Sequence, residues 1–159
     1  MGWELFKISE VLSKNIILNL QARNKEEVLR EILEYFERKG VVKHKEDILK
    51  KILEREIISS TGIGHSIAIP HIRTELVSTP VLFAGISHIG VYFNSIDGEP
   101  VKIIFILLTP ADDCDSTIAI LSSLSKILQS AEIRKKLIDS KSINEFLNII
   151  KAAERAQSQ

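Results

Sequence analysis

Two stretches in the first third of the chain carry apolar residues at helical spacing. Residues 25–39, KEEVLREILEYFERK, follow Asn24, a favoured N-cap, and precede Gly40, a favoured residue just past a helix end. Residues 45–58, KEDILKKILEREII, repeat the pattern. The pattern therefore predicts two amphipathic helices. The residues expected on or near the stripe of each helix are Val28, Leu29, Ile32, Leu33 and Phe36 in the first and Ile48, Leu49, Ile52, Leu53 and Glu56 in the second.

The middle of the chain has the composition of β-strands. Residues 15–20 are apolar and β-branched, and residues 80–88 and 91–95 read as two strands that flank Ile89-Gly90. Residues 101–109, VKIIFILLT, are nearly all apolar and follow the turn sequence DGEP. A strand without polar alternation is expected at the centre of a sheet that is covered on both faces.

Three further helices are predicted after this central strand, over residues 116–129, 131–139 and 142–156. Ser142 and Glu145 form a capping-box sequence at the start of the last of them. The order of strand, helix pair, strands and helices predicts an α/β fold with helices on a sheet. We expect one domain over residues 1–159, with a core at about 7–150 and a frayed C-terminal tail.

Composition excludes several classes of partner. The 159 residues hold 21 basic and 21 acidic side chains, so the formal net charge is zero and predicts neither nucleic-acid binding nor attraction to a membrane surface. The longest apolar run, residues 103–108, is too short to span a bilayer, and the N-terminus lacks a signal-peptide pattern. The single cysteine, Cys114, cannot form an internal disulfide. We expect a cytoplasmic protein that does not insert into membranes.

Residues 60–75, STGIGHSIAIPHIRTE, combine two histidines with glycines and a proline. The spacing between His65 and His71 does not match that of zinc ligands. The chain also lacks the nucleophile elbow of serine hydrolases and the glycine fingerprints of nucleotide-binding proteins. The acidic residues 112, 113 and 115 are interpreted as a solvated helix N-terminus. No metal and no cofactor are predicted.

The same stretch suits a histidine that accepts a phosphoryl group. Such a histidine needs one ring nitrogen free and the other held by a hydrogen bond, with backbone N–H groups or a guanidinium nearby. Pro70 restricts the backbone next to His71, and Gly62 and Gly64 allow a loop to fold close to it. Arg55 is available on the preceding helix. The residue types alone favour a structural role for His71, because a lone histidine near a proline is more often structural than functional.

The run from Glu54 to His71, EREIISSTGIGHSIAIPH, resembles the signature of mannitol/fructose-type IIA domains of the bacterial phosphoenolpyruvate:sugar phosphotransferase system. It is most similar to the nitrogen-regulatory branch, and the resemblance extends over about residues 7–150. The resemblance implies a single-domain sandwich with a central mixed β-sheet flanked by helices, the mannitol-type IIA fold.

By this resemblance His71 is the phosphoacceptor, modified on Nε2 by an HPr-like phosphocarrier protein, and Arg55 stabilises the phosphoryl group. His65, Gly64 and Arg73 are candidate neighbours of the site.

Three positions depart from the family pattern. Ile72 stands where a small residue usually follows the histidine, so its bulk is expected to narrow the approach of the donor or, alternatively, to provide an apolar contact for a dedicated donor. Thr117 stands where the family often has a second histidine, and Thr can donate a hydrogen bond but carries no charge. Arg73 lies in IRTE, which replaces a small basic stretch, and is expected to supply positive charge instead.

Three functions stay open at this point. The first is a phosphotransferase component that carries the group on histidine and regulates nitrogen or general metabolism through a target protein. The second is a sugar-specific IIA subunit that passes phosphate to a IIB partner, and the third is an interaction domain that is never phosphorylated. The chain shows no IIB-like cysteine segment and no transmembrane IIC part, which favours regulation. The oligomeric state is not predicted.

Overall fold

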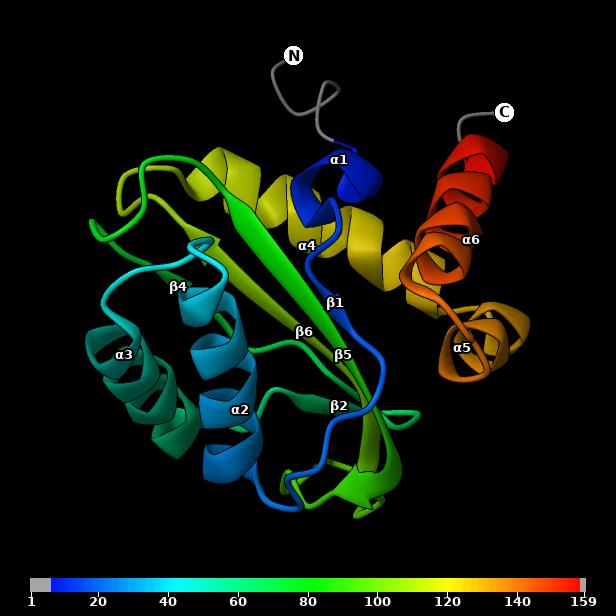
Figure 1. The fold of residues 1–159 in the computed structure, drawn as a ribbon, viewed down its shortest axis with the longest axis horizontal. Helices are drawn as coiled ribbons and strands as arrows, with labels where there is room; N and C mark the ends of the chain where they lie inside the picture. Colours follow the sequence, from blue (N-terminus) through cyan, green and yellow to red (C-terminus); the bar gives the residue numbers. More distant parts are fainter. Residues whose placement is uncertain (1–6, 158–159) are drawn as a thin grey trace.

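A six-stranded mixed sheet forms the centre of the computed structural model, which describes residues 7–157 (Figure 1). The strand order is β1-β5-β6-β3-β2, with β4 also paired to β6. The long antiparallel pair β5–β6 dominates the sheet, β1 is parallel to β5, and both β3 and β4 are parallel to β6. The strands are β1 Ile16–Ile17, β2 Gly62–Gly64, β3 Ile67–Ala68, β4 His71–Arg73, β5 Val81–Val91 and β6 Val101–Thr109.

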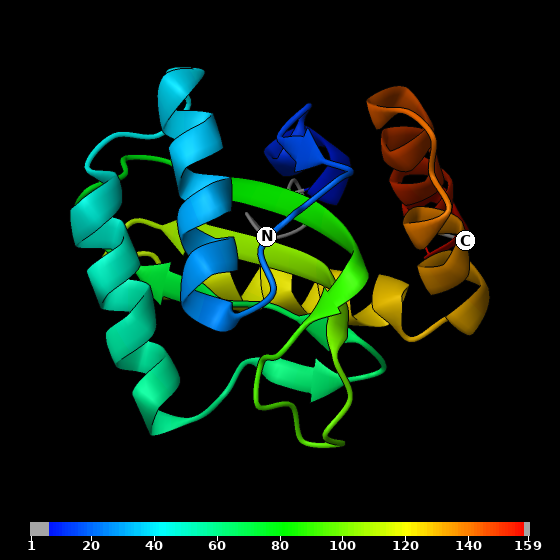
Figure 2. The same cartoon turned by 60° about the horizontal axis from the view of Figure 1, so that its bottom comes forward.

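Helices cover both faces of this sheet, as Figures 1 and 2 show, which confirms the predicted fold class. One face packs against the pair α2 Lys25–Arg38 and α3 Lys45–Ile58. The other packs against α1 Ile8–Leu12, α4 Cys114–Leu128, α5 Ala131–Ile138 and α6 Ile143–Gln157. None of the helices within residues 7–157 has the length and apolar character needed to cross a membrane.

Strand β6 lies between the two hydrophobic cores, as its unbroken apolar sequence predicts. Ile103, Phe105 and Leu107 face the core under α1, α4, α5 and α6. The intervening Ile104, Ile106 and Leu108 face the core under α2 and α3. Because side chains alternate between the faces of a strand, both sets are fully buried only when both faces are covered.

The predicted helix ends agree with the structure to within a few residues. Asn24 Oδ1 accepts a hydrogen bond from Glu27 N at 2.9 Å, and Gly40 has a φ of 77°, as a residue after a helix end requires. Ser142 Oγ accepts from Glu145 N at 3.0 Å. The last helix extends through Gln157, and residues 158–159 of the predicted tail lie outside the described part.

The prediction of two strands at 80–88 and 91–95 is wrong, because β5 runs unbroken from Val81 to Val91. The pairing with β6 shifts register between Ile86 and Val91, and Gly90 adopts a φ of 95° there. A bulge thus absorbs Ile89-Gly90 without ending the strand. The predicted strand 15–20 is shortened to Ile16–Ile17.

Several short elements have no counterpart in the sequence prediction. Helix α1 has five residues, and its first two N–H groups, of Ile8 and Ser9, donate to the Glu154 carboxylate at 2.7 and 3.1 Å. Strands β2 and β3 form a hairpin whose two turn residues, His65 and Ser66, have φ values of 55° and 64°. Elements this short carry no hydrophobic period, so their partners decide their conformation.

Candidate functional site: a histidine pocket between two helices

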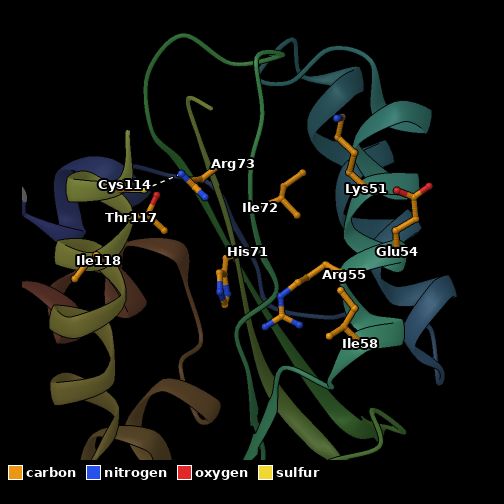
Figure 3. Close-up of a pocket in the computed structure, with 10 residues that line it drawn as sticks. All are labelled: Lys51, Glu54, Arg55, Ile58, His71, Ile72, Arg73, Cys114, Thr117 and Ile118. Atoms are coloured by element: carbon orange, nitrogen blue, oxygen red, sulfur yellow. Dashed lines mark hydrogen bonds between the residues drawn. The ribbon is translucent and has the colours of Figure 1, made fainter. Parts of the chain in front are cut away.

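A surface pocket lies where β4 passes between α3 and α4 (Figure 3). Figure 3 shows His71 on the strand between the two helices, with the Arg55 side chain extending from α3 toward it. Ten residues line the pocket: Lys51, Glu54, Arg55 and Ile58 from α3, His71, Ile72 and Arg73 from β4, and Cys114, Thr117 and Ile118 from α4.

Strand β4 determines which side chains reach the pocket. Its three residues pair with Leu107, Leu108 and Thr109 of β6, and the carbonyl of Pro70 accepts a hydrogen bond from Leu107 N at 2.9 Å. Along the strand His71 is half-buried, Ile72 buried and Arg73 exposed. Because side chains alternate on a strand, His71 and Arg73 share the face away from Ile72.

The ring of His71 is held in one tautomer by the backbone. Its Nδ1 lies 2.7 Å from the carbonyl oxygen of Ile69. A carbonyl oxygen only accepts hydrogen bonds, so Nδ1 must carry the hydrogen. In the neutral ring Nε2 then keeps its lone pair, which is the state that a nucleophilic histidine needs.

Arg55 lies in the last turn of α3 and is anchored by the chain that follows the helix. Its Nη1 donates to the carbonyl of Ser59 at 2.9 Å, which satisfies one of the carbonyls left free at a helix C-terminus. This bond uses one of the five N–H donors of the guanidinium. The remaining donors suit a phosphoryl group in the same pocket.

Arg73 connects β4 to the first turn of α4. Its Nη1 donates to Cys114 Sγ at 2.7 Å and to the carbonyl of Ala111 at 3.4 Å. With Lys51 and Arg55 it gives the pocket three cationic side chains, against the single carboxylate of Glu54. The pocket is therefore suited to an anion.

Thr117 reaches the pocket from α4 with its hydroxyl already engaged. Thr117 Oγ1 donates to the carbonyl of Asp113 at 2.9 Å and lies 2.6 Å from Thr109 Oγ1. Asp113 caps the helix by accepting from Ser116 N at 3.0 Å. The Ser116 side chain and N–H lower the pKa of the Asp113 carboxyl below its usual value.

The structure brings four of the predicted site residues together, namely Arg55, His71, Arg73 and Thr117. Ile72 also borders the pocket, yet only 9% of its surface is exposed, and it packs in the core under α2 and α3. Its bulk therefore fills the core rather than standing over the ring.

His65 and Gly64 lie in the β2–β3 hairpin and do not line the pocket. The backbone N–H of His65 donates to Asp97 Oδ2 at 3.2 Å, which ties this hairpin to the loop before β6.

Sequence reasoning missed five residues of the pocket, and for all of them a signal was present. The four residues of α3 follow the spacing i, i+3, i+4, i+7, and the three of α4 follow i, i+3, i+4. Such spacing places side chains on one face of a helix. The missed residues are Lys51, Glu54, Ile58, Cys114 and Ile118.

Comparisons with known proteins agree on one family. The model of the family described as "Phosphoenolpyruvate-dependent sugar phosphotransferase system, EIIA 2" matches residues 10–153. The fructose-specific EIIABC component of Bacillus subtilis (strain 168) is 37% identical over 145 residues, which are 91% of this chain. The chain spans only 23% of the length of that relative.

Two solved structures illustrate the likeness in fold. The nitrogen regulatory protein IIA-Ntr of Neisseria meningitidis superposes with a TM-score of 0.82 at 30% identity, covering 90% of this chain and 98% of its own. The complex of IIA-mannitol with phosphorylated IIB-mannitol from Escherichia coli matches with a TM-score of 0.74 at 22% identity, over 88% of this chain and 96% of that chain.

Proposed function

Since this chain belongs to the EIIA 2 family of the phosphoenolpyruvate-dependent sugar phosphotransferase system, we propose that it carries a phosphoryl group on Nε2 of His71. The observation that supports this proposal best is the bond from His71 Nδ1 to the Ile69 carbonyl, which leaves Nε2 as the nucleophile. The donor is a phosphohistidine protein of the HPr type, and the acceptor is a further protein.

In the proposed transfer the Nε2 lone pair attacks the phosphorus of the donor phosphohistidine. The new N–P bond forms as the donor's N–P bond breaks, and its electron pair returns to the donor ring. The His71 ring then carries a positive charge, which the Ile69 carbonyl stabilises through the Nδ1 hydrogen. The reaction needs no metal and no cofactor, because the phosphoryl group passes directly between two ring nitrogens.

The cationic side chains of the pocket act on the phosphoryl oxygens. Phosphoryl transfer depends mainly on positioning and on stabilising charge spread over three equatorial oxygens. Arg55 has free guanidinium donors in the same pocket as His71, and Lys51 and Arg73 add positive charge. We assign Arg55 the main role, since its planar fork can bind two oxygens at once.

Replacing His71 tests this function. Wild-type protein and the variant His71→Ala are incubated with phosphoenolpyruvate and the general phosphotransferase proteins, and the mass of each is measured before and after acid treatment. We expect an acid-labile phosphoryl adduct on the wild type alone. His65→Asn is the matched control, because Asn tolerates the positive φ at this turn, and it should be labelled fully. The proposal is contradicted if His71→Ala is labelled or if the wild type is not labelled.

For the output of the carrier we propose regulation of a target protein in the cytoplasm. The likeness to IIA-Ntr over nearly the full length of both chains supports this choice. A sugar-specific role is the second candidate, because the fructose-specific component of Bacillus subtilis has the higher identity. Offering the phosphorylated protein to a fructose-type IIB domain separates the two. Rapid transfer of the label to IIB supports the sugar role, and a label that stays on His71 supports regulation.

A further inference from the structure

A buried carboxylate lies on the turn of α3 that carries Arg55. Glu56 has only 7% of its surface exposed. Both of its carboxylate oxygens accept from Thr61 N, at 3.2 and 3.0 Å, and Oε1 also accepts from the Thr61 hydroxyl at 3.0 Å. Lys25 Nζ lies 3.3 Å from the same oxygen. A charge at this depth is stable only with such partners, so Glu56 and Thr61 hold each other firmly in place.

Thr61 connects this carboxylate to the histidine through two further hydrogen bonds. The carbonyl of Thr61 accepts from Ile69 N at 3.1 Å. The carbonyl of the same Ile69 accepts from His71 Nδ1 at 2.7 Å. A continuous series of contacts therefore leads from Glu56 through Thr61 and Ile69 to the ring nitrogen that sets the tautomer of His71.

The segment around Thr61 also helps to position the Arg55 side chain. Arg55 Nη1 donates to the carbonyl of Ser59, two residues before Thr61. Ser60 Oγ accepts from Gly62 N at 3.0 Å and donates to the carbonyl of Phe93 at 2.5 Å, which fixes the segment from the other side. The acceptor nitrogen and the guanidinium thus both depend on residues 59–61.

We propose that Glu56 is a positioning residue for the phosphoacceptor: by holding Thr61 it aims the Ile69 carbonyl at His71 Nδ1 and keeps Nε2 free of hydrogen. The consequence for transfer rests on the proposed function, whereas the effect on the ring does not. An imidazole without such a partner exchanges between its two tautomers, and the form with hydrogen on Nε2 has no lone pair there to attack phosphorus.

The test compares three variants of the series with one matched control. Glu56→Gln replaces one carboxylate oxygen by an NH₂ group that cannot accept from Thr61. Thr61→Val removes the hydroxyl, and Thr61→Ser keeps it. The control is Glu31→Gln, because Glu31 also accepts from two backbone N–H groups, but these belong to Gln21 and Ala22, which are not part of the series that leads to His71.

Two measurements are made on each folded variant. The ¹⁵N shifts of the His71 ring, recorded without any donor protein, report its tautomer. Rates of phosphorylation at several donor concentrations separate the saturated rate from the half-saturating concentration. For Glu56→Gln and Thr61→Val we expect a smaller share of the Nδ1–H tautomer and a saturated rate lower by about tenfold, which corresponds to about 1.4 kcal/mol. The half-saturating donor concentration should not change, because the docking surface is intact.

Thr61→Ser should restore both values, and Glu31→Gln should match the wild type. The proposal is overturned if Glu56→Gln and Thr61→Val keep the wild-type tautomer, or if the control changes the tautomer as much as they do. If Glu56→Gln does not fold, the Thr61 pair decides alone. A wild type that is never labelled on His71 refutes the proposed function, while the ring shifts still decide the role of Glu56.

Discussion

Thr117 and Thr109 are hydrogen-bonded to each other through their side-chain oxygens, which lie 2.6 Å apart. Thr117 Oγ1 also donates to the carbonyl of Asp113 at 2.9 Å. Because a hydroxyl has one hydrogen, Thr109 must be the donor in the pair. Thr117 therefore fastens the start of α4 to β6 and has no hydrogen left for a phosphoryl group. The positive charge of the pocket comes instead from Lys51, Arg55 and Arg73.

Thr117→Val should leave phosphoryl transfer unchanged. The hydroxyl holds the start of α4 in place and does not contact the phosphoryl group. Its loss should therefore lower the free energy of unfolding by about 1 kcal/mol without slowing transfer. Denaturant unfolding and the saturated transfer rate of the same preparation check both parts. Thr117→Ser, which keeps the hydroxyl, is the control. A tenfold slower transfer at unchanged stability would show that Thr117 contacts the phosphoryl group.

Arg55→Lys should slow transfer by about tenfold, or about 1.4 kcal/mol, because lysine keeps the charge but loses the bidentate fork. The variant also loses the guanidinium contact with the Ser59 carbonyl. Single-turnover labelling by an HPr-type donor measures the rate. Arg38→Lys, at the end of α2 and outside the pocket, serves as the control and should transfer like the wild type. Equal transfer rates for Arg55→Lys and Arg38→Lys would show that the guanidinium of Arg55 does not stabilise the phosphoryl group.

Ile72→Ala should lower stability by about 3 kcal/mol, since it deletes buried methyl groups from the core. From the sequence alone, shortening this side chain is expected to speed the donor's approach. With 9% of Ile72 exposed, little of it stands in the donor's way. Thermal or denaturant unfolding measures the loss, and Ile72→Val should show a smaller one. A faster saturated rate in Ile72→Ala would restore the view that its bulk obstructs transfer.

The cap of α4 should make stability depend on pH in acid. The Ser116 hydroxyl and N–H lower the pKa of Asp113 from its usual value of 3.8. The contribution of this carboxylate is therefore fully present above that value and is lost as the pH falls through the lowered pKa. Asp113→Asn keeps a cap without a charge that titrates. The difference in unfolding free energy between wild type and variant should shrink in acid, and a difference that stays constant with pH would refute this.

Local pattern was enough to predict most of the helices, β6 and the family. The stripes and end residues of α2 and α3 act within a few residues, so a single stretch of sequence contains all that determines them. The same holds for the unbroken apolar run of β6. His71 and Arg55 could be predicted as site residues because the motif that carries them is contiguous, from Glu54 to His71.

Only the tertiary structure decided the features that depend on distant partners. The first N–H groups of helix α1 donate to the carboxylate of Glu154, near the other end of the chain. Strand β4 forms through its backbone pairing with β6. The burial of Ile72 in the core under α2 and α3 follows from the packing of these helices on one face of the sheet. The hydrogen bond between Thr117 and Thr109 forms because α4 packs on the other face. Helical spacing places Glu56 on or near the apolar stripe of α3, but the sequence does not show which groups its carboxylate contacts. Its role appears only when packing removes it from water, because a buried carboxylate must take its hydrogen bonds from the backbone folded against it.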